Sequence, residues 1–164
     1  DKTLSALGAY LICYGSSGHL QEPTGLITEN FTRHSYPDFK INRHVKTIVK
    51  GGLIADAPWA VSTHVFETPH GTVDELLRPI AKGWSWEHEP SHTVFRINHY
   101  VTQSYDFYRH KKRFMGAADV SPDQERDASW FAKMDRNECD DGVRYLFLLK
   151  LKIKIEEMMG LCFV

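Results

Sequence analysis

The stretch LSALGAYLICYGSSGH, residues 4–19, decides the fold class because it joins a short apolar run to a glycine-rich turn. The run at residues 4–14 contains aromatic and β-favouring residues, and a helix would need more length. The pattern therefore predicts a buried β-strand. The same run is too short to span a bilayer, which needs about 20 apolar residues. It also lacks the basic flank and the cleavage pattern of a signal peptide.

Short apolar runs predict further strands along the chain. We expect them at residues 41–49, around 63–66, at 93–101 and, from the alternation of Lys with Leu and Ile, at 146–155. A frayed helix is the alternative for the last of these segments. Helix-start signals predict helices elsewhere. They cover residues 24–34, residues 104–115 before Gly116, and a segment that begins at Ser121. The mixture indicates an α/β fold.

The length and the charge balance limit the classes of protein that fit. A chain of 164 residues suits one ordinary domain or a piece of a larger one, and we interpret a sequence that begins at Asp1 as a fragment. Twenty Lys and Arg against 21 Asp and Glu exclude the strong basic excess of a polyanion-coating protein, so no nucleic-acid partner is expected. Three scattered Cys residues indicate neither a disulfide framework nor a Cys-rich zinc site, which favours a reducing compartment.

The turn Gly15-Ser16-Ser17-Gly18 follows the first predicted strand. Glycine lets the backbone approach a ligand closely, so we expect N–H groups that are free to meet phosphate or sugar oxygens. The turn is not a P-loop, because no Lys follows it, and it is one residue short of the GxSxG pattern of serine hydrolases. A plain strand-to-loop turn is the alternative.

The segment INHY at residues 97–100 places His99 at the end of a predicted strand. Strand alternation sends Asn98 and Tyr100 to the opposite face. His99 is therefore well placed to ligate a metal or to contact a phosphate, and a hydrogen-bonded structural histidine is the alternative. The other closely spaced histidines do not have the spacing of zinc pairs. They are His64 with His70, and His88 with His92.

The predicted helix at residues 104–115 carries one lysine within its apolar face. At 100° per residue, Lys111 falls among Phe107, Tyr108, Phe114 and Met115. One interpretation is an inward cation that reaches an anion close to the strand before it, and the other is a side chain that snorkels to the surface. The remaining charges of the RHKKR run are expected on a solvated face.

Taken together, these segments resemble the second half of bacterial family-2-like and family-92 glycosyltransferases. The matching motifs stand in the same order as in that family, over roughly residues 8–140. They are YGSSGH at 14–19, GLITENFTRHS at 25–35, NRHVKTIVK at 42–50, THVF at 63–66 and RINHYVTQSYDFYRHKKR at 96–113. The segment RDASWFAKMDRNECDD at 126–141 resembles the ending of the bacterial members.

The resemblance implies a partial GT-A fold, with residues 1–145 forming the C-terminal part of a catalytic domain and 146–164 a tail without a counterpart. It implies inverting transfer from a nucleotide-sugar donor to a saccharide or other hydroxyl acceptor, usually with a divalent cation, Mn²⁺ or Mg²⁺. Each candidate residue follows from its place in the matched motifs. His99 corresponds to a metal ligand, Gly15 to Gly18 to a glycine loop, Lys46 and Lys111 to cations on the leaving diphosphate, and His19 and Glu29 are the nearest candidates for the base.

The sequence departs from the family because it contains no DxD triplet, the motif that holds the metal on the donor diphosphate. We therefore expect the chain alone to be inactive. The alternative function is a non-catalytic carbohydrate- or nucleotide-binding module in which tryptophans form stacking platforms. The candidates for such platforms are Trp59, Trp84, Trp86 and Trp130. We expect a cytoplasmic protein, with peripheral membrane association left open.

Overall fold

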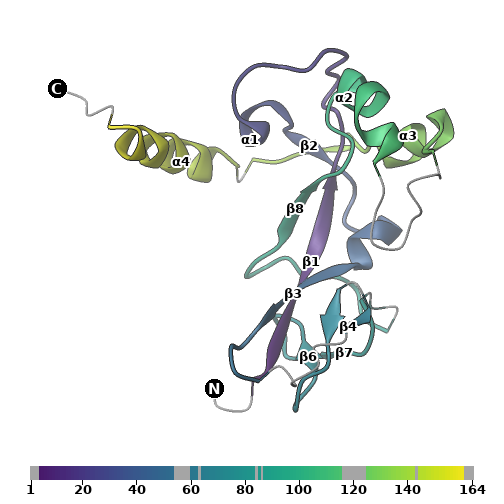
Figure 1. Ribbon diagram of the computed structural model, residues 1–164, viewed down its shortest axis with the longest axis vertical. Coiled ribbons are helices and arrows are strands. Elements are labelled where there is room, and N and C mark those ends of the chain that lie inside the picture. Colours follow the sequence, from purple (N-terminus) through teal and green to yellow (C-terminus); the bar gives the residue numbers. More distant parts are fainter. Residues whose placement is uncertain are drawn as a thin grey trace.

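A seven-stranded mixed sheet forms the centre of the protein (Figure 1). The computed structural model describes residues 4–53, 60–62, 64–83, 85, 87–115, 125–142 and 144–160. Within these residues, helices and 3₁₀ turns alternate with strands, and a separate two-stranded sheet is also present. The α/β class predicted from the sequence is confirmed.

Strand β1 (Ala6–Tyr14) has partners along both edges. One edge pairs antiparallel with β3 (Val45–Val49) and, at its end, with β2 (Arg33–His34). The other edge pairs parallel with β6 (Thr72–Val73) and then with β8 (Ile97–Tyr100). From its third residue onward every residue of β1 is buried. The prediction of a buried strand at residues 4–14 is confirmed.

The remaining strands are short and lie at the margins of the two sheets. Two of them extend the main sheet, β7 (Pro79–Ile80) beside β6 and β9 (Cys139–Asp140) beside β2. The other two, β4 (Ala60–Ser62) and β5 (Val65–Phe66), form the small antiparallel sheet. The strand expected around residues 63–66 is therefore present as β5, while Thr63 lies outside the described residues.

The hydrophobic core lies on one face of the first half of β1. Tyr10, Val45, Val65 and Ile80 form a buried cluster that joins both sheets. Packing here is close, since a Cβ added at Gly8 would lie 2.9 Å from the Ile80 side chain. Full burial of such apolar side chains stabilises the folded state by about 1.5–3 kcal/mol each.

The helix expected at residues 104–115 begins at the predicted place and ends early. Ser104 is the N-cap, and its Oγ accepts a hydrogen bond of 3.1 Å from the backbone N–H of Phe107. Helix α2 covers Tyr105–His110, after which Lys111 leaves helical geometry with φ −125° and ψ −65°. A 3₁₀ turn, η2, follows at Lys112–Phe114. The single continuous helix of the sequence prediction is wrong, because this break shifts the angular position of every later side chain.

Three other segments differ in extent from the prediction. The helix expected at residues 24–34 is the single turn α1 (Ile27–Asn30), and β2 occupies its last residues. The strand expected at residues 41–49 begins as the 3₁₀ turn η1 (Lys40–Arg43) before β3. The segment from Ser121 begins outside the described residues. Helix α3 (Ala128–Met134) follows it, with Asp127 as its N-cap.

Residues 146–155 belong to helix α4 (Arg144–Met158), so the predicted strand is wrong and the helical alternative is correct. Leu, Lys, Glu and Met are strong helix formers, and their propensities outweigh the period-two alternation of Lys with apolar residues. In Figure 1, α4 projects away from the sheet. Lys152 joins it to α1 by an ion pair with Glu29. None of the described helices has both the length and the apolar character needed to cross a membrane.

The segment at residues 135–137 closes the loop that follows β1. The backbone N–H groups of Ser16 and Ser17 donate to the side chains of Asp135 and Asn137. Gly15 lies directly against this segment, and a Cβ at its position would be 2.4 Å from the Arg136 carbonyl oxygen. Only glycine fits at position 15 without displacing the backbone of the closing segment.

Gly15→Ala is therefore expected to lower the free energy of unfolding by about 1–3 kcal/mol, the cost of forcing atoms into a filled site. Urea denaturation followed by circular dichroism measures the change. Gly51→Ala is the matched control, because a Cβ there has no heavy atom within 4 Å. Equal stabilities of the two variants would contradict the close contact at Gly15.

Candidate functional site

The loop Gly15 to Gly18 uses its N–H groups within the protein. Ser16 and Ser17 donate to the closing segment, and Gly18 donates to Ser16 Oγ over 3.2 Å. Ser17 Oγ in turn accepts from the backbone N–H of Thr32 at 2.8 Å. The expectation that these amides are free to meet phosphate is wrong, because the chain itself supplies their acceptors. The loop acts as a structural joint between β1 and the segment at 135–137.

The two candidate bases, His19 and Glu29, both lie at α1. His19 Nε2 lies 3.0 Å from the carbonyl oxygen of Asn30, and its ring packs edge-on against Phe31. Glu29 forms an ion pair with Lys152, whose hydrogen bond lowers the pKa of the Glu29 carboxyl. A carboxylate with a lowered pKa is a weaker base. Of the two candidates, His19 is the one that forms no ion pair among the contacts described here.

His99 lies on the face of the sheet that also carries Cys13. The two residues are register partners, and His99 Nδ1 is 3.8 Å from Cys13 Sγ. Burial lowers the pKa of His99 to about 4, and the nearby charges of Lys112, Lys46 and other basic groups add to the effect. The imidazole is therefore neutral at pH 7.

The charges of four basic side chains lower the pKa of His99, and we call these four together with His99 the basic cluster. They are His44, Lys46, His64, Lys112 and His99. Lys46 pairs with Ala9 of β1, which puts its side chain on the same face as His99. The rings of His44 and His64 are 5.5 Å apart. Burial lowers the pKa of Lys112, with Arg126 as the next cause. A cluster of this kind attracts anions.

Lys111 extends to the surface, so the inward interpretation is wrong and the alternative, a snorkelling side chain, is correct. Its Nζ lies 3.4 Å from Glu22 Oε1 and 5.5 Å from the centroid of the Phe107 ring, and its side chain is 57% exposed. The break after α2 explains the difference, because it turns Lys112 inward in its place. Sequence periodicity had assigned Lys112 to the solvated face and could not indicate the break.

The residues described around His99 do not form a recognisable metal site. Among the described parts of the chain, no group of three His, Cys, Asp or Glu side chains is arranged to hold a metal ion. The neighbours of His99 that act on its charge state are basic, and like charges repel a cation. The cation implied by the family resemblance stays a prediction.

The opposite face of the sheet carries a cavity of about 500 Å³. It lies between β8, the loop at residues 92–96, α1 and the first turns of α4. Asn98 and Tyr100 point toward it, because strand alternation turns them away from His99. The basic cluster and the cavity therefore lie on opposite faces of one strand.

A buried polar network forms one wall of this cavity. Tyr14 donates its hydroxyl to Asp141, and Arg96 Nη2 lies 2.7 Å from Asp141 Oδ2. Arg96 also donates from Nη2 to the Tyr14 oxygen at 3.0 Å and from Nε to Asn98 Oδ1 at 2.9 Å. Burial, followed by the bond to Asp141, raises the pKa of Tyr14. Sequence reasoning missed Asp141, because no local pattern links it to residues so far away in the chain.

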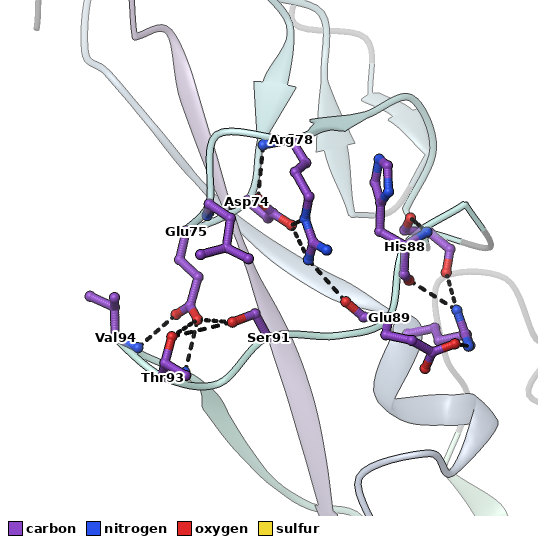
Figure 2. Close-up of polar contacts among 11 residues, drawn as sticks. Asp74, Glu75, Arg78, His88, Glu89, Ser91, Thr93 and Val94 are labelled. Carbon is purple, nitrogen blue, oxygen red and sulfur yellow. Dashed lines mark hydrogen bonds and ion pairs between the residues drawn. The ribbon is translucent and has the colours of Figure 1, made fainter.

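Glu75 holds the loop that lines the cavity (Figure 2). Its carboxylate accepts backbone hydrogen bonds from Thr93 at 2.8 Å, Val94 at 3.0 Å and Phe95 at 2.9 Å. The hydroxyls of Ser91 and Thr93 donate to it as well. Because these backbone N–H groups donate to the Glu75 side chain, they cannot also pair with a neighbouring strand. Strand β8 therefore begins at Ile97 rather than at residue 93.

The tryptophans proposed as stacking platforms fall into two groups. Trp59, Trp84 and Trp86 lie outside the residues whose side chains are described. Trp130 stacks on Tyr108, with ring centroids 6.2 Å apart and an interplanar angle of 15°. Its ring also lies 5.3 Å from the Arg126 guanidinium. Trp130 therefore packs α3 against α2.

Comparison of the chain with protein-family models, with curated proteins and with solved structures found no match. The resemblance to glycosyltransferases thus depends on the order of the sequence motifs. The structure adds two surfaces on which a function can be argued, the basic cluster and the cavity.

The hydrogen bonds to Glu75 make part of the stability depend on pH. Burial alone raises the pKa of Glu75, but the bonds from Ser91, Phe95 and Thr93 outweigh it and lower the pKa to about 2. The unfolded chain has a glutamate pKa of about 4.3. The contribution of Glu75 to stability is thus complete above that pH and is lost as the pH falls toward 2.

Glu75→Gln is expected to reduce the free energy of unfolding at pH 7 by about 1.5–3 kcal/mol, the range for hydrogen bonds to a charged group. The deficit relative to the unchanged protein should shrink between pH 4 and pH 2. Urea denaturation at a series of pH values measures both effects. The control is Glu67→Gln at an exposed position. A deficit that does not vary with pH would show that the carboxylate is not the stabilising group.

Proposed function

We propose that the chain is the acceptor-side, C-terminal part of a GT-A-like glycosyltransferase domain. The substrates would be a nucleotide-sugar donor and a saccharide or other hydroxyl acceptor. The observation that carries the proposal is the basic cluster, in which Lys46 of β3 and His99 of β8 lie on the same face of the sheet. Sugar transfer releases a nucleoside diphosphate, and cations placed where that negative charge develops stabilise the transition state.

The position of the cluster in the sheet supports the same function. The parallel strands β1 and β8 end beside one another, at the register pair Tyr14 and Tyr100. In α/β sheets, ligands bind outside the carboxyl ends of the strands. His99 and Cys13 stand one residue before these ends, so His99 borders the edge at which a donor would lie.

The members of the cluster would act in different ways. The exposed Lys46 and the half-buried Lys112 supply positive charge to the diphosphate. His99 is neutral at pH 7 and would donate a single hydrogen bond. A base must remove the proton of the acceptor hydroxyl as its oxygen attacks the anomeric carbon, while the bond to the diphosphate breaks.

His19 is the base that the geometry favours. Its Nε2 donates to the carbonyl of Asn30, so in the neutral form of the ring Nδ1 carries the lone pair. The carbonyl of His19 accepts from the backbone N–H of Tyr105 at the start of α2, which places this residue beyond the carboxyl end of β8. Glu29, in contrast, is held by Lys152.

Lys112→Met is expected to weaken the binding of inorganic pyrophosphate about ten- to a hundredfold. That range corresponds to the loss of one charge-assisted contact. The measurement is isothermal titration calorimetry in buffer with EDTA, which removes metal ions. Lys111→Met is the matched control, because the adjacent side chain faces outward toward Glu22 and its loss should change the affinity little. Equal effects in both variants, or no pyrophosphate binding to the unchanged protein, would contradict the role of the cluster.

The 164-residue chain alone is expected to show no sugar transfer, because its sequence contains no DxD carboxylates to organise the donor diphosphate. The assay follows release of nucleoside diphosphate from a panel of nucleotide sugars, with saccharide acceptors and either Mn²⁺ or Mg²⁺. Robust turnover by the purified chain would show that the carboxylate pair is dispensable. Pyrophosphate binding without turnover is the combined result that the proposal requires.

A further inference from the structure

The cavity on the face opposite the basic cluster has the size of a small-molecule site. Its volume of about 500 Å³ lies within the range of about 300–1,000 Å³ that is usual for ligand pockets. Asn98 and Tyr100 line it, while His99, between them in sequence, faces the basic cluster. The cavity is therefore separate from the surface on which the proposed function depends.

Apolar side chains from two elements form most of the cavity wall. Val94 and Phe95 come from the loop held by Glu75, and Phe147, Leu148 and Leu151 come from α4. Val94 and Phe147 remain 73% and 68% exposed. A ligand that covered this apolar surface would gain about 25 cal/mol for each Å² removed from water.

The charged groups of the cavity wall are compensated. The Arg96 guanidinium lies 2.7 Å from the Asp141 carboxylate, so the pair carries no net charge. His92 is also neutral, because burial lowers its pKa, and its Nε2 donates to the Leu11 carbonyl at 3.0 Å. Among the described side chains of the wall, a ligand with a net charge would find no unpaired counterion, and it would lose its hydration. The wall thus selects against anions and cations.

Two polar groups of the wall lack full hydrogen bonding. The hydroxyl oxygen of Thr28 is buried and has no partner among the described residues. Asn98 accepts from Arg96 through Oδ1, which leaves the NH₂ end of its amide as a donor. A buried hydroxyl without a partner costs free energy, and a ligand hydroxyl would satisfy it.

We infer that this cavity binds a neutral ligand that has an apolar body and several hydroxyl groups, such as an alkyl glycoside. The apolar wall takes the body of the ligand. Thr28 and Asn98 bind its hydroxyls, and the compensated pair of Arg96 and Asp141 excludes charged analogues. The site needs neither the donor nor the basic cluster, so it stands independently of the proposed sugar transfer.

The test compares two probes that differ only at C6 of the sugar, where one has a hydroxymethyl group and the other a carboxylate. Octyl β-glucoside, used below its critical micelle concentration, is expected to bind saturably to the 164-residue chain in isothermal titration calorimetry. Octyl β-glucuronide has the same size and carries a carboxylate, and it should bind at least about tenfold more weakly because that charge is not compensated. Absence of saturable glucoside binding, or equal binding of the two probes, would overturn the inference.

Matched variants locate the binding within the cavity. Thr28→Val should weaken glucoside binding about three- to tenfold, the value of one neutral hydrogen bond, while Thr24→Val at an exposed position should not. Leu148→Trp fills the cavity and should reduce binding by more than about tenfold. Leu149→Trp, on a side chain 66% exposed and outside the cavity wall, is its control.

Two further measurements distinguish a loss of binding in the cavity from a general effect of the substitutions on the protein. The Leu148→Trp and Leu149→Trp variants are expected to unfold at similar temperatures in circular dichroism, because both substitutions leave helix α4 intact. Equal losses of glucoside binding in these two variants would overturn the assignment of the cavity. Pyrophosphate binding should stay unchanged in Leu148→Trp, so a failure of this inference is distinguishable from a failure of the proposed function.

Discussion

Two-sided pairing of β1 is the constraint on which the rest of the structure depends. A buried backbone must place each N–H and C=O group in a hydrogen bond, and β1 is buried over most of its length. Strands β2, β3, β6 and β8 supply many of these bonds. Side chains supply others, since Asn42 Oδ1 accepts from the Cys13 N–H at 2.9 Å and His92 Nε2 donates to the Leu11 carbonyl. Segments far apart in sequence are thereby held at one strand.

Short sequence patterns predicted those parts of the fold that depend on interactions between residues close together in the chain. The apolar run at residues 4–14 and the Ser104 cap are signals of this kind, and both are confirmed. The tail at residues 146–155 was assigned wrongly, because an alternation of Lys with Leu and Ile is compatible with either period when the residues are also strong helix formers. Whether such a segment forms a strand or a helix depends on whether a partner strand is available to pair with it. The local sequence does not indicate whether one is available.

The candidate site was less predictable, because its geometry depends on single contacts. The break in the helix at the single residue Lys111 is enough to turn Lys111 outward and Lys112 inward, the reverse of what a continuous helix predicts. The composition of the turn at residues 15–18 indicated available amides, yet Asp135 and Asn137 occupy them from more than a hundred positions away. The pairing of Tyr14 with Asp141 spans a similar separation. His99 kept its expected place near the end of a strand, since strand alternation is a local property.

The same alternation limits how the two surfaces can cooperate. Strand β8 turns His99 toward the basic cluster and turns Asn98 and Tyr100 toward the cavity, so the body of the sheet separates the two sites. A hydroxyl bound in the cavity cannot attack a sugar held at the cluster, because the reacting atoms must come within about 3–3.5 Å. An acceptor would instead have to enter beyond the carboxyl ends of β1 and β8, where His19 lies. A ligand in the cavity would then act through the loop at residues 92–96 and the joined strand β8, by fixing the strand that carries His99.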